Sequence, residues 1–295
     1  MAKVAWLGLG VMGYPMAGYL ANRGQHSVTV YNRTPAKAGA WVRHYGVGQT
    51  AETPEDAARD ADFVFACVGN DDDLRSVTTG PDGAFKSMKP GSIFIDHTTA
   101  SADVARDLAT VASTQGCTFL DCPVSGGQAG AEGGTLTIMC GGDEAAYQKA
   151  EPLMSCYAKS VRLIGASGAG QLTKMVNQIA VAGVIQGLAE AIHFAESANL
   201  DLDAVMATIS KGAAQSWQME NRWKTMHARQ FDFGFAVDWI LKDLRIVLDE
   251  ARRNRAELPV TTLLEEYYEQ IQKTGGNRWD SSSLITRLGS GGGSA

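Results

Sequence analysis

The chain has 295 residues, more than one typical domain needs, and this length suggests two domains. Its formal net charge is −6, its pI is near 5.4, and no stripe of basic residues occurs, so we do not expect a nucleic-acid partner. We expect no membrane-spanning run and no signal peptide, because the first strand begins by Val4, and therefore a cytoplasmic location.

A short apolar segment at the start of the chain, residues 4–7, runs into a glycine-rich turn and then into a helical pattern. In a Gly-x-Gly-x-x-Gly turn the first glycine permits the tight bend and the second lets backbone N–H groups approach a pyrophosphate. The third allows the helix to pack closely on the strand. The pattern predicts a dinucleotide site formed by Gly8, Leu9, Gly10, Val11, Met12 and Gly13.

The next strand, residues 27–31, ends where the residue that contacts the cofactor ribose is expected. An NAD enzyme usually places a carboxylate there, whereas this chain has Asn32, Arg33 and Thr34. A guanidinium pairs with a 2′-phosphate and stacks on adenine, and a threonine adds a hydroxyl donor. We therefore expect these three residues to select NADP(H), with NAD(H) bound at lower affinity. The alternative is a polar turn leading to Pro35.

Further apolar strands alternate with helical segments. The strand patterns cover residues 61–68, 91–96, 118–122, 135–140 and 161–164. This alternation predicts an α/β fold, a Rossmann doubly wound parallel sheet, in which ligands bind beyond the carboxyl ends of the strands. Val68, Gly69 and Thr99 should line the nicotinamide half of the cleft, together with His97.

Neither the cysteines nor the histidines show the spacing of metal ligands, so we expect no metal site. The five cysteines are interpreted as small core residues in a reducing compartment. They are Cys67, Cys117, Cys122, Cys140 and Cys156.

The pattern changes near residue 165. Residues 170–199 run without proline and are rich in helix formers and apolar side chains, which predicts a long, buried central helix that also contacts a partner subunit. Further helices are expected over residues 203–211, 238–255 and 261–273. We therefore predict an NADP-binding Rossmann domain over residues 1–164 and an all-helical substrate and dimerisation domain over residues 165–288. Residues 289–295 have linker composition.

Two polar residues near the start of the long helix are candidates for proton transfer. Lys174 and Asn177 are three residues apart and so share one face of the helix. A lysine that is partly desolvated can have its pKa lowered towards neutrality, which suits acid–base work on a carbonyl oxygen. On periodicity alone, a surface lysine is the commoner explanation.

A second candidate site follows the strand that ends near Asp121. Ser125, Gly126 and Gly127 offer successive N–H groups and a hydroxyl that could hold a carboxylate. A simple turn between strands explains an isolated Ser-Gly-Gly equally well.

Four motifs together resemble the β-hydroxyacid dehydrogenase family, which includes 3-hydroxyisobutyrate dehydrogenases, tartronate semialdehyde reductases and short succinic semialdehyde reductases. The resemblance covers residues 1 to about 288 and overrides the structural alternatives given above. The motifs lie at residues 8–17, 121–127, 168–177 and 242–244.

The resemblance implies a role for each matching residue. Lys174 would be the general acid in reduction and the base in oxidation, and Asn177 would orient the substrate. Ser125, Gly126 and Gly127 would hold the substrate carboxylate, and Lys242 would lie where cofactor and substrate meet. The family also implies an all-helical second domain and a homodimer or homotetramer.

Two departures limit this transfer, and three other functions are alternatives to it. Gln178 stands where many members have a second asparagine, and Cys122 stands where alanine is usual. An imine reductase of the same fold usually has Asp or Tyr in place of the lysine. The presence of Lys174 therefore argues against an imine reductase. A non-catalytic NADP-binding sensor would lose the proton-transfer pair. 6-Phosphogluconate dehydrogenases share the motifs but need a larger helical domain.

The substrate is expected to be a small carboxylate-bearing C3 or C4 semialdehyde or hydroxy acid. The residues that recognise its other end are less defined by the sequence, and a role in the core is at least as good an explanation for each candidate. The candidates are Trp217, Met219, Phe231, Phe235 and Trp239.

Overall fold

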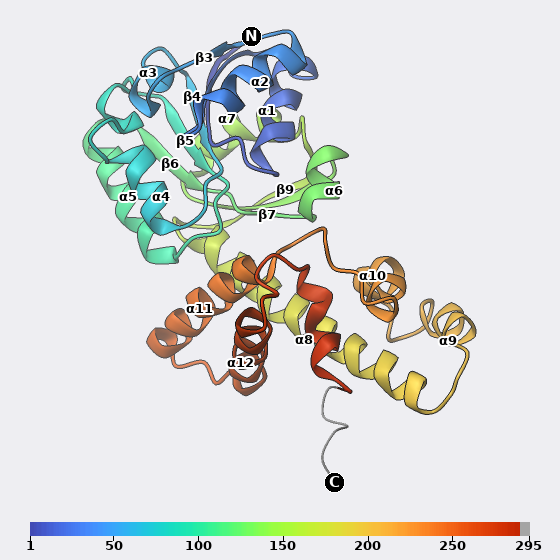
Figure 1. The fold of residues 1–295 in the computed structure, drawn as a ribbon. Coiled ribbons are helices and arrows are strands. Elements are labelled where there is room, and N and C mark those ends of the chain that lie inside the picture. Colours follow the sequence, from blue (N-terminus) through green and yellow to red (C-terminus); the bar gives the residue numbers. More distant parts are fainter. Residues whose placement is uncertain (290–295) are drawn as a thin grey trace. The chain divides into compact units, whose positions relative to one another are not determined.

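A computed structural model describes residues 1–289 and divides the chain into two compact units (Figure 1). The first unit is Met1–Lys174 and the second begins at Met175. The division therefore falls within a long helix, ten residues after the boundary expected from the sequence. The linker-like residues 290–295 lie outside the described part of the chain.

The first unit contains a nine-stranded sheet whose main order is β3-β2-β1-β4-β5-β6-β8-β7, with β9 paired to β8. The pairs from β3 through β6 are parallel. The strands are β1 (Lys3–Leu7), β2 (Ser27–Tyr31), β3 (Gln49–Thr50), β4 (Phe63–Ala66), β5 (Ile93–Asp96), β6 (Thr118–Asp121), β7 (Val124–Ser125), β8 (Leu136–Gly141) and β9 (Ala158–Gly165).

The predicted Rossmann fold with a parallel sheet is confirmed from β3 through β6, and beyond β6 the sheet also contains antiparallel pairs. Strand β8 runs antiparallel to both β6 and β7, because the chain turns back through Ser125 and the glycines that follow it. The two-residue strands β3 and β7 were also not predicted, since so short a segment has no alternating pattern to detect.

Helices cover both faces of this sheet (Figure 1). Successive strand residues point to opposite faces, so Trp6 packs in one core and Leu7 in the other. Helices α1, α2 and α7 contribute to the core that contains Trp6, and α3, α4 and α5 to the core that contains Leu7. The helical segments are α1 (Gly13–Asn22), α2 (Pro35–Tyr45), α3 (Pro54–Ala58), α4 (Asp71–Thr78), η1 (Ala84–Lys86), α5 (Ala102–Thr114), α6 (Gly127–Glu132) and α7 (Glu144–Met154).

The second unit is helical and has a core of its own, which includes Ile185, Leu241 and Tyr268. Helix α10 was not predicted, because its polar residues leave a weak apolar pattern. Helix α8 begins in the first unit and continues into the second. The elements are α8 (Ala169–Ser197), α9 (Leu202–Ile209), α10 (Trp217–His227), α11 (Val237–Asn254), α12 (Pro259–Lys273) and η2 (Ser281–Arg287).

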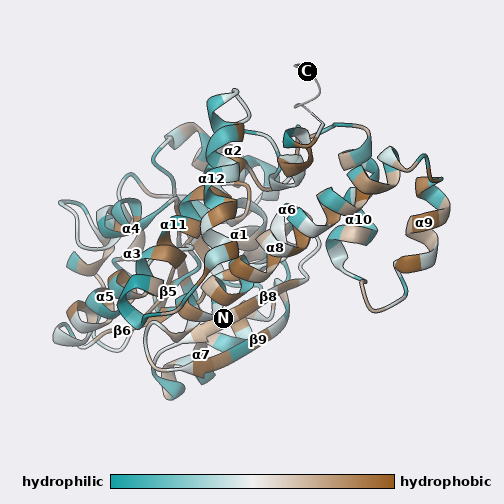
Figure 2. Cartoon of the chain, turned by 90° about the horizontal axis from the view of Figure 1, so that it is seen from below, coloured by the Kyte–Doolittle hydropathy of each residue, from teal (hydrophilic) through white to brown (hydrophobic). Residues whose placement is uncertain are grey.

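Hydrophobic residues recur along α8 (Figure 2). By length and composition it is the one helix among residues 1–289 that could cross a membrane, so the expectation that no such run exists is wrong. These criteria are weak evidence, because the core helix of a soluble protein also meets them. Ile185, Leu188 and Ile192 are at most 4% exposed and pack in the core of the second unit.

Candidate active site

The glycine turn after β1 has the geometry that a pyrophosphate requires. Gly8 has φ +98°, and a Cβ there would lie 2.4 Å from the carbonyl oxygen of Cys67. A Cβ at Gly13 would lie 2.1 Å from the carbonyl oxygen of Gly8, so the start of α1 can approach β1 only with glycine. A Cβ at Gly10 would meet nothing within 4 Å, and no acidic side chain occupies the first turn of α1. The residues therefore fit a dinucleotide phosphate at this helix end.

Asn32 supports the glycine turn from the end of β2. Its Oδ1 accepts a hydrogen bond of 2.9 Å from the backbone N–H of Leu9, and its Nδ2 donates to the carbonyl oxygen of Thr34 at 3.1 Å. The backbone N–H of Gly8 also donates to the carbonyl oxygen of Tyr31. The Asn32 side chain thus holds the shape of the loop.

Arg33 and Thr34 lie on the surface beyond β2. The Arg33 side chain is 84% exposed, and its Nη1 lies 2.9 Å from Oδ1 of Asp73 in α4. Thr34 precedes α2 and makes no side-chain cap to it. Both side chains are thus accessible to a ligand at the end of the second strand.

The ends of β4 and β5 are joined through Thr98. Its hydroxyl accepts from the backbone N–H of Val68 at 3.1 Å, and its own N–H donates to Oδ1 of Asp96 at 2.9 Å. Val68, Gly69 and Thr99 are each partly exposed at this edge of the sheet. Because the carboxyl ends of parallel strands meet at one edge, these residues share that edge with the glycine turn.

His97 is a core residue, and the expectation that it lines the cleft is not met. It is 2% exposed and stacks on Trp6 and Phe65. Burial lowers the pKa of His97 to about 4, so the ring is neutral at pH 7. Its Nδ1 contacts the carbonyl oxygen of Cys122 at 2.6 Å and its Nε2 the hydroxyl of Tyr157 at 2.8 Å.

A buried carboxylate at the end of β6 anchors the start of α8. Asp121 is fully buried, and its two oxygens accept from the backbone N–H groups of Gly168 at 2.8 Å and Gln171 at 2.9 Å. Burial raises the pKa of Asp121, while these N–H donors oppose that rise. A Cβ at Gly170 would lie 2.3 Å from the carbonyl oxygen of Asp121, so only glycine permits this approach.

The Gln171 side chain makes a second link between α8 and the sheet. It is fully buried, its Nε2 donates to the carbonyl oxygen of Thr98 at 2.7 Å, and its Oε1 accepts from the N–H of Ala100 at 3.1 Å. Residues three apart on a helix share a face, so Gln171 places Lys174 one turn further along the same face. Lys174 is 8% exposed, which excludes the surface-lysine explanation.

Ser125 ends β7, Gly126 follows it, and Gly127 begins α6. Gly126 has φ +133° and Gly127 has φ +60°, backbone conformations that residues other than glycine rarely adopt. Both glycines are exposed and Ser125 is partly exposed. The turn follows β7, which is hydrogen-bonded to β8. Elsewhere in the first unit, the glycine turn after β1, the ends of β4 and β5 and the start of α8 lie along the carboxyl edge of the sheet.

In the second unit, a chain of polar contacts connects three helical residues to Lys242. Asn177 Nδ2 donates to Gln178 Oε1 at 2.8 Å, and Gln178 Nε2 donates to Asp243 Oδ2 at 2.6 Å. Lys242 Nζ lies 3.0 Å from Asp243 Oδ1. Gln178 is 4% exposed and Asp243 is 2% exposed, so this network is largely buried. Gln178 therefore makes defined polar contacts of its own.

The aromatic and methionine candidates for substrate recognition divide into two groups. Met219 and Phe231 are buried in the core of the second unit, and Phe235 packs against it. Trp217 and Trp239 are 49% and 38% exposed. The core explanation therefore holds for the first three.

Cys117, Cys122 and Cys140 are buried, whereas Cys67 and Cys156 are half-buried. Within residues 1–289, no cluster of three or more His, Cys, Asp or Glu could hold a metal ion.

Several residues of this site have roles that the sequence does not indicate. Asp121 and Gln171 belong to sequence motifs, yet their contacts with α8 and Thr98 come from elements far apart in the chain. Asp73 was not noted at all, because an acidic residue in the first turn of a helix is common.

Comparison with known proteins agrees with this geometry. Residues 3–165 match the NAD binding domain of 6-phosphogluconate dehydrogenase, and residues 168–288 match the NAD-binding family of NADP-dependent 3-hydroxyisobutyrate dehydrogenase. The chain belongs to the β-hydroxyacid dehydrogenase family. It is thus an NAD(P)-dependent hydroxyacid dehydrogenase, with a nicotinamide dinucleotide as its cofactor.

Relatives within the β-hydroxyacid dehydrogenase family match along almost the whole chain. An uncharacterized oxidoreductase of Shewanella frigidimarina (strain NCIMB 400) is 61% identical over 98% of each chain. The 2-hydroxy-3-oxopropionate reductase of Escherichia coli (strain K12) is 34% identical over 97% of each chain. The structure of Mycobacterium tuberculosis 3-hydroxyisobutyrate dehydrogenase with L-serine matches with a TM-score of 0.87 and 30% identity, covering 98% of this chain and 99% of that one.

Proposed function

We propose that this dehydrogenase uses NADP(H) to interconvert a small 3-hydroxy acid or 4-hydroxy acid and its semialdehyde, with Lys174 as proton donor and acceptor. The observation that carries the proposal is the burial of Lys174 one turn beyond the anchored start of α8. Lysine is seldom this buried, and its burial at the start of α8 favours a role in the site over that of a solvated surface residue.

The residues divide the work of the reaction. The cofactor, when bound, supplies or accepts the hydride at the carbonyl carbon. Lys174 Nζ donates a proton to the developing alkoxide in reduction and accepts the hydroxyl proton in oxidation. Asn177 lies on the same helix and orients the substrate. The N–H groups of Gly126 and Gly127 and the Ser125 hydroxyl bind the carboxylate.

Support for NADP(H) comes from the end of β2. Arg33 is exposed and carries a guanidinium suited to a phosphate, and no carboxylate stands among residues 32–34. A 2′-phosphate at this place would therefore meet a cation instead of an anion. NAD(H) lacks this phosphate and is expected to bind more weakly.

An imine reductase and a non-catalytic NADP sensor are the alternatives. Both Lys174 and Asn177 are present, and Lys174 is buried beside the cofactor-binding unit's strand ends, which favours the dehydrogenase over either one. The name of the E. coli relative, a 2-hydroxy-3-oxopropionate reductase, supports a C3 semialdehyde among the substrates.

A substrate panel tests the proposed function. NADPH and NADH consumption is measured with succinic, methylmalonic and tartronic semialdehydes and with a cyclic imine. We expect turnover of at least one semialdehyde and a preference for NADPH. Turnover of the imine alone would contradict the assignment of substrate class, and equal use of NADH would contradict the role of Arg33.

A further inference from the structure

Arg33 has a carboxylate partner within its own protein. Its Nη1 lies 2.9 Å from Oδ1 of Asp73, the third residue of α4. The residue that would bind the cofactor's 2′-phosphate is therefore already engaged by an anion. A phosphate at Arg33 must either displace this carboxylate or bind beside it, and both have an electrostatic cost.

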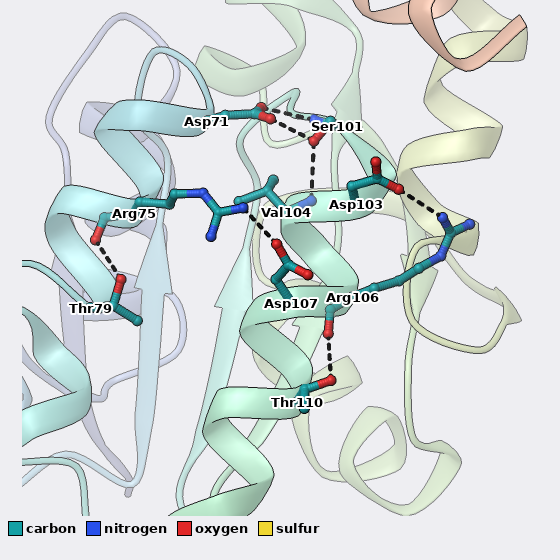
Figure 3. Close-up of polar contacts among 9 residues, drawn as sticks. All are labelled: Asp71, Arg75, Thr79, Ser101, Asp103, Val104, Arg106, Asp107 and Thr110. Atoms are coloured by element: carbon teal, nitrogen blue, oxygen red, sulfur yellow. Dashed lines mark hydrogen bonds and ion pairs between the residues drawn. The ribbon is translucent and has the colours of Figure 1, made fainter. Parts of the chain in front are cut away.

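Asp73 is held in place by the start of α4. Its backbone N–H donates to Oδ1 of Asn70, which caps the helix. Figure 3 shows how the same helix is fixed to α5: both carboxylate oxygens of Asp71 accept from Ser101, and Arg75 pairs with Asp107. The Asp73 side chain is 30% exposed, whereas that of Arg33 is 84% exposed. The arginine is thus the more exposed member of the pair, and the aspartate lies on a helix turn that its backbone N–H helps to fix.

We propose that Asp73 is a specificity-determining residue that competes with the 2′-phosphate of NADP(H) for Arg33 and so moderates the preference over NAD(H). The inference rests on the proposed role of Arg33 in NADP(H) binding. Adenosine 5′-phosphate has no group to compete with Asp73, so the effect should be confined to ligands that carry a 2′-phosphate.

The acidic start of α4 provides a matched control. Asp72 is the neighbouring residue on the same helix and is exposed. Asp72→Asn and Asp73→Asn remove one negative charge each from the same turn, but only Asp73 pairs with Arg33. Asparagine at position 73 also leaves the backbone bond to Asn70 intact, so we expect both variants to fold.

Binding of 2′,5′-ADP and 5′-AMP to the full chain, measured by calorimetry, tests the proposal without turnover. Asp73→Asn should raise the affinity for 2′,5′-ADP about threefold to tenfold, the effect expected from the loss of one exposed charge partner. It should leave the affinity for 5′-AMP unchanged. Asp72→Asn should change either affinity by less than about twofold. An equal gain in both variants, or weaker 2′,5′-ADP binding in Asp73→Asn, would overturn the competition.

A double-mutant cycle with Arg33→Ala shows whether the effect passes through the arginine. Arg33→Ala should weaken 2′,5′-ADP, and Asp73→Asn should add little in that background. If Arg33→Ala changes nothing, the NADP(H) role of Arg33 fails and the competition fails with it. If Arg33→Ala weakens binding but Asp73→Asn gives no gain, the competition alone is wrong.

Discussion

At the scale of single residues, Gln178 shows how a departure from a family pattern can be accommodated. The Gln178 amide donates a hydrogen bond from its Nε2 to Asp243, and its Oε1 accepts one from Asn177. Because a carboxylate only accepts, this contact fixes which end of the Gln178 amide faces Asn177. The sequence showed the substitution, but Asp243 lies 65 residues away, and no local pattern indicates that pairing.

Asp96 is a second residue whose environment the sequence did not reveal. It is fully buried at the end of β5, and its Oδ2 has no hydrogen-bond partner within residues 1–289. Burial raises the pKa of Asp96 to about 8, and the nearby Asp121 and Asp71 act in the same direction. The folded protein therefore keeps a neutral carboxylic acid here at pH 7.

This shift predicts a pH-dependent stability. Between the unfolded pKa near 3.8 and about 8, the folded state binds the Asp96 proton more tightly, so stability falls as pH rises. The free energy of unfolding of Asp96→Asn, relative to that of wild type, should therefore rise by about 1.4 kcal/mol per pH unit between pH 6.5 and 7.5. Urea unfolding of the variant and of wild type at these two pH values measures this change. Burial lowers the pKa of His97 to about 4, but His97 is present in both proteins, so its own contribution cancels in the comparison.

Asp60→Asn is the matched control, because Asp60 is exposed. Its stability relative to wild type should be the same at both pH values. If Asp96→Asn also shows no pH dependence, Asp96 is ionised in the folded protein at neutral pH, contrary to this account.

At the scale of elements, the start of α8 is the junction on which the site depends. Helical composition was enough to predict residues 170–199 as one helix, close to the observed Ala169–Ser197. The sequence could not show that Asp121 caps this helix from β6, because the two segments are 47 residues apart. A helix cap supplied by the residue just before the helix can be recognised in the sequence, whereas a cap supplied by a distant strand cannot.

Asp121→Asn tests this junction. An asparagine keeps one acceptor and turns an NH₂ group towards an N–H donor, so we expect a loss of about 1–3 kcal/mol in unfolding free energy. Turnover should also fall, because Lys174 would no longer be held by a fixed first turn. Urea unfolding and steady-state turnover measure the two effects.

Asp143→Asn is the control for the loss of a helix cap elsewhere in the same unit. Asp143 caps α7 in the same unit by accepting from Ala146 at 2.8 Å, and it is exposed. It should lower stability to a smaller extent and leave turnover unchanged. Equal losses of turnover in both variants would indicate general destabilisation and contradict a specific role for the Asp121 cap.

At the scale of the whole molecule, the sequence predicted the classes of both units but not the details of the sheet. Alternating strands and helices indicated the Rossmann unit, since most of its strands contain a short apolar run. The strand over residues 135–140 was predicted, but its antiparallel direction and the short strand β7 were not. That direction is set by a turn at Gly126 and Gly127 whose conformation the sequence alone does not reveal.

We also propose that the second unit forms a homodimer or homotetramer. Apolar side chains on the later part of α8 and just beyond it are exposed in the single chain, among them Phe194 at 72%, Leu200 at 51% and Val184 at 39%. Exposed apolar residues of this size favour a protein interface. Phe194→Glu should therefore reduce the assembly to a smaller species in analytical ultracentrifugation.

Val260→Glu, which places a charge at a 59% exposed apolar residue of α12, is the comparison variant. It should leave the sedimentation coefficient unchanged. A wild-type chain that sediments as a monomer would refute the proposed assembly.

The central claim is that Lys174 transfers the proton while the rest of the first unit binds the cofactor. The most direct test is single-turnover NADPH oxidation by Lys174→Ala with a semialdehyde that wild type reduces, together with NADPH binding by fluorescence. We predict a loss of hydride-transfer rate of at least about 100-fold with NADPH affinity unchanged within about threefold. A rate close to that of wild type would contradict the claim.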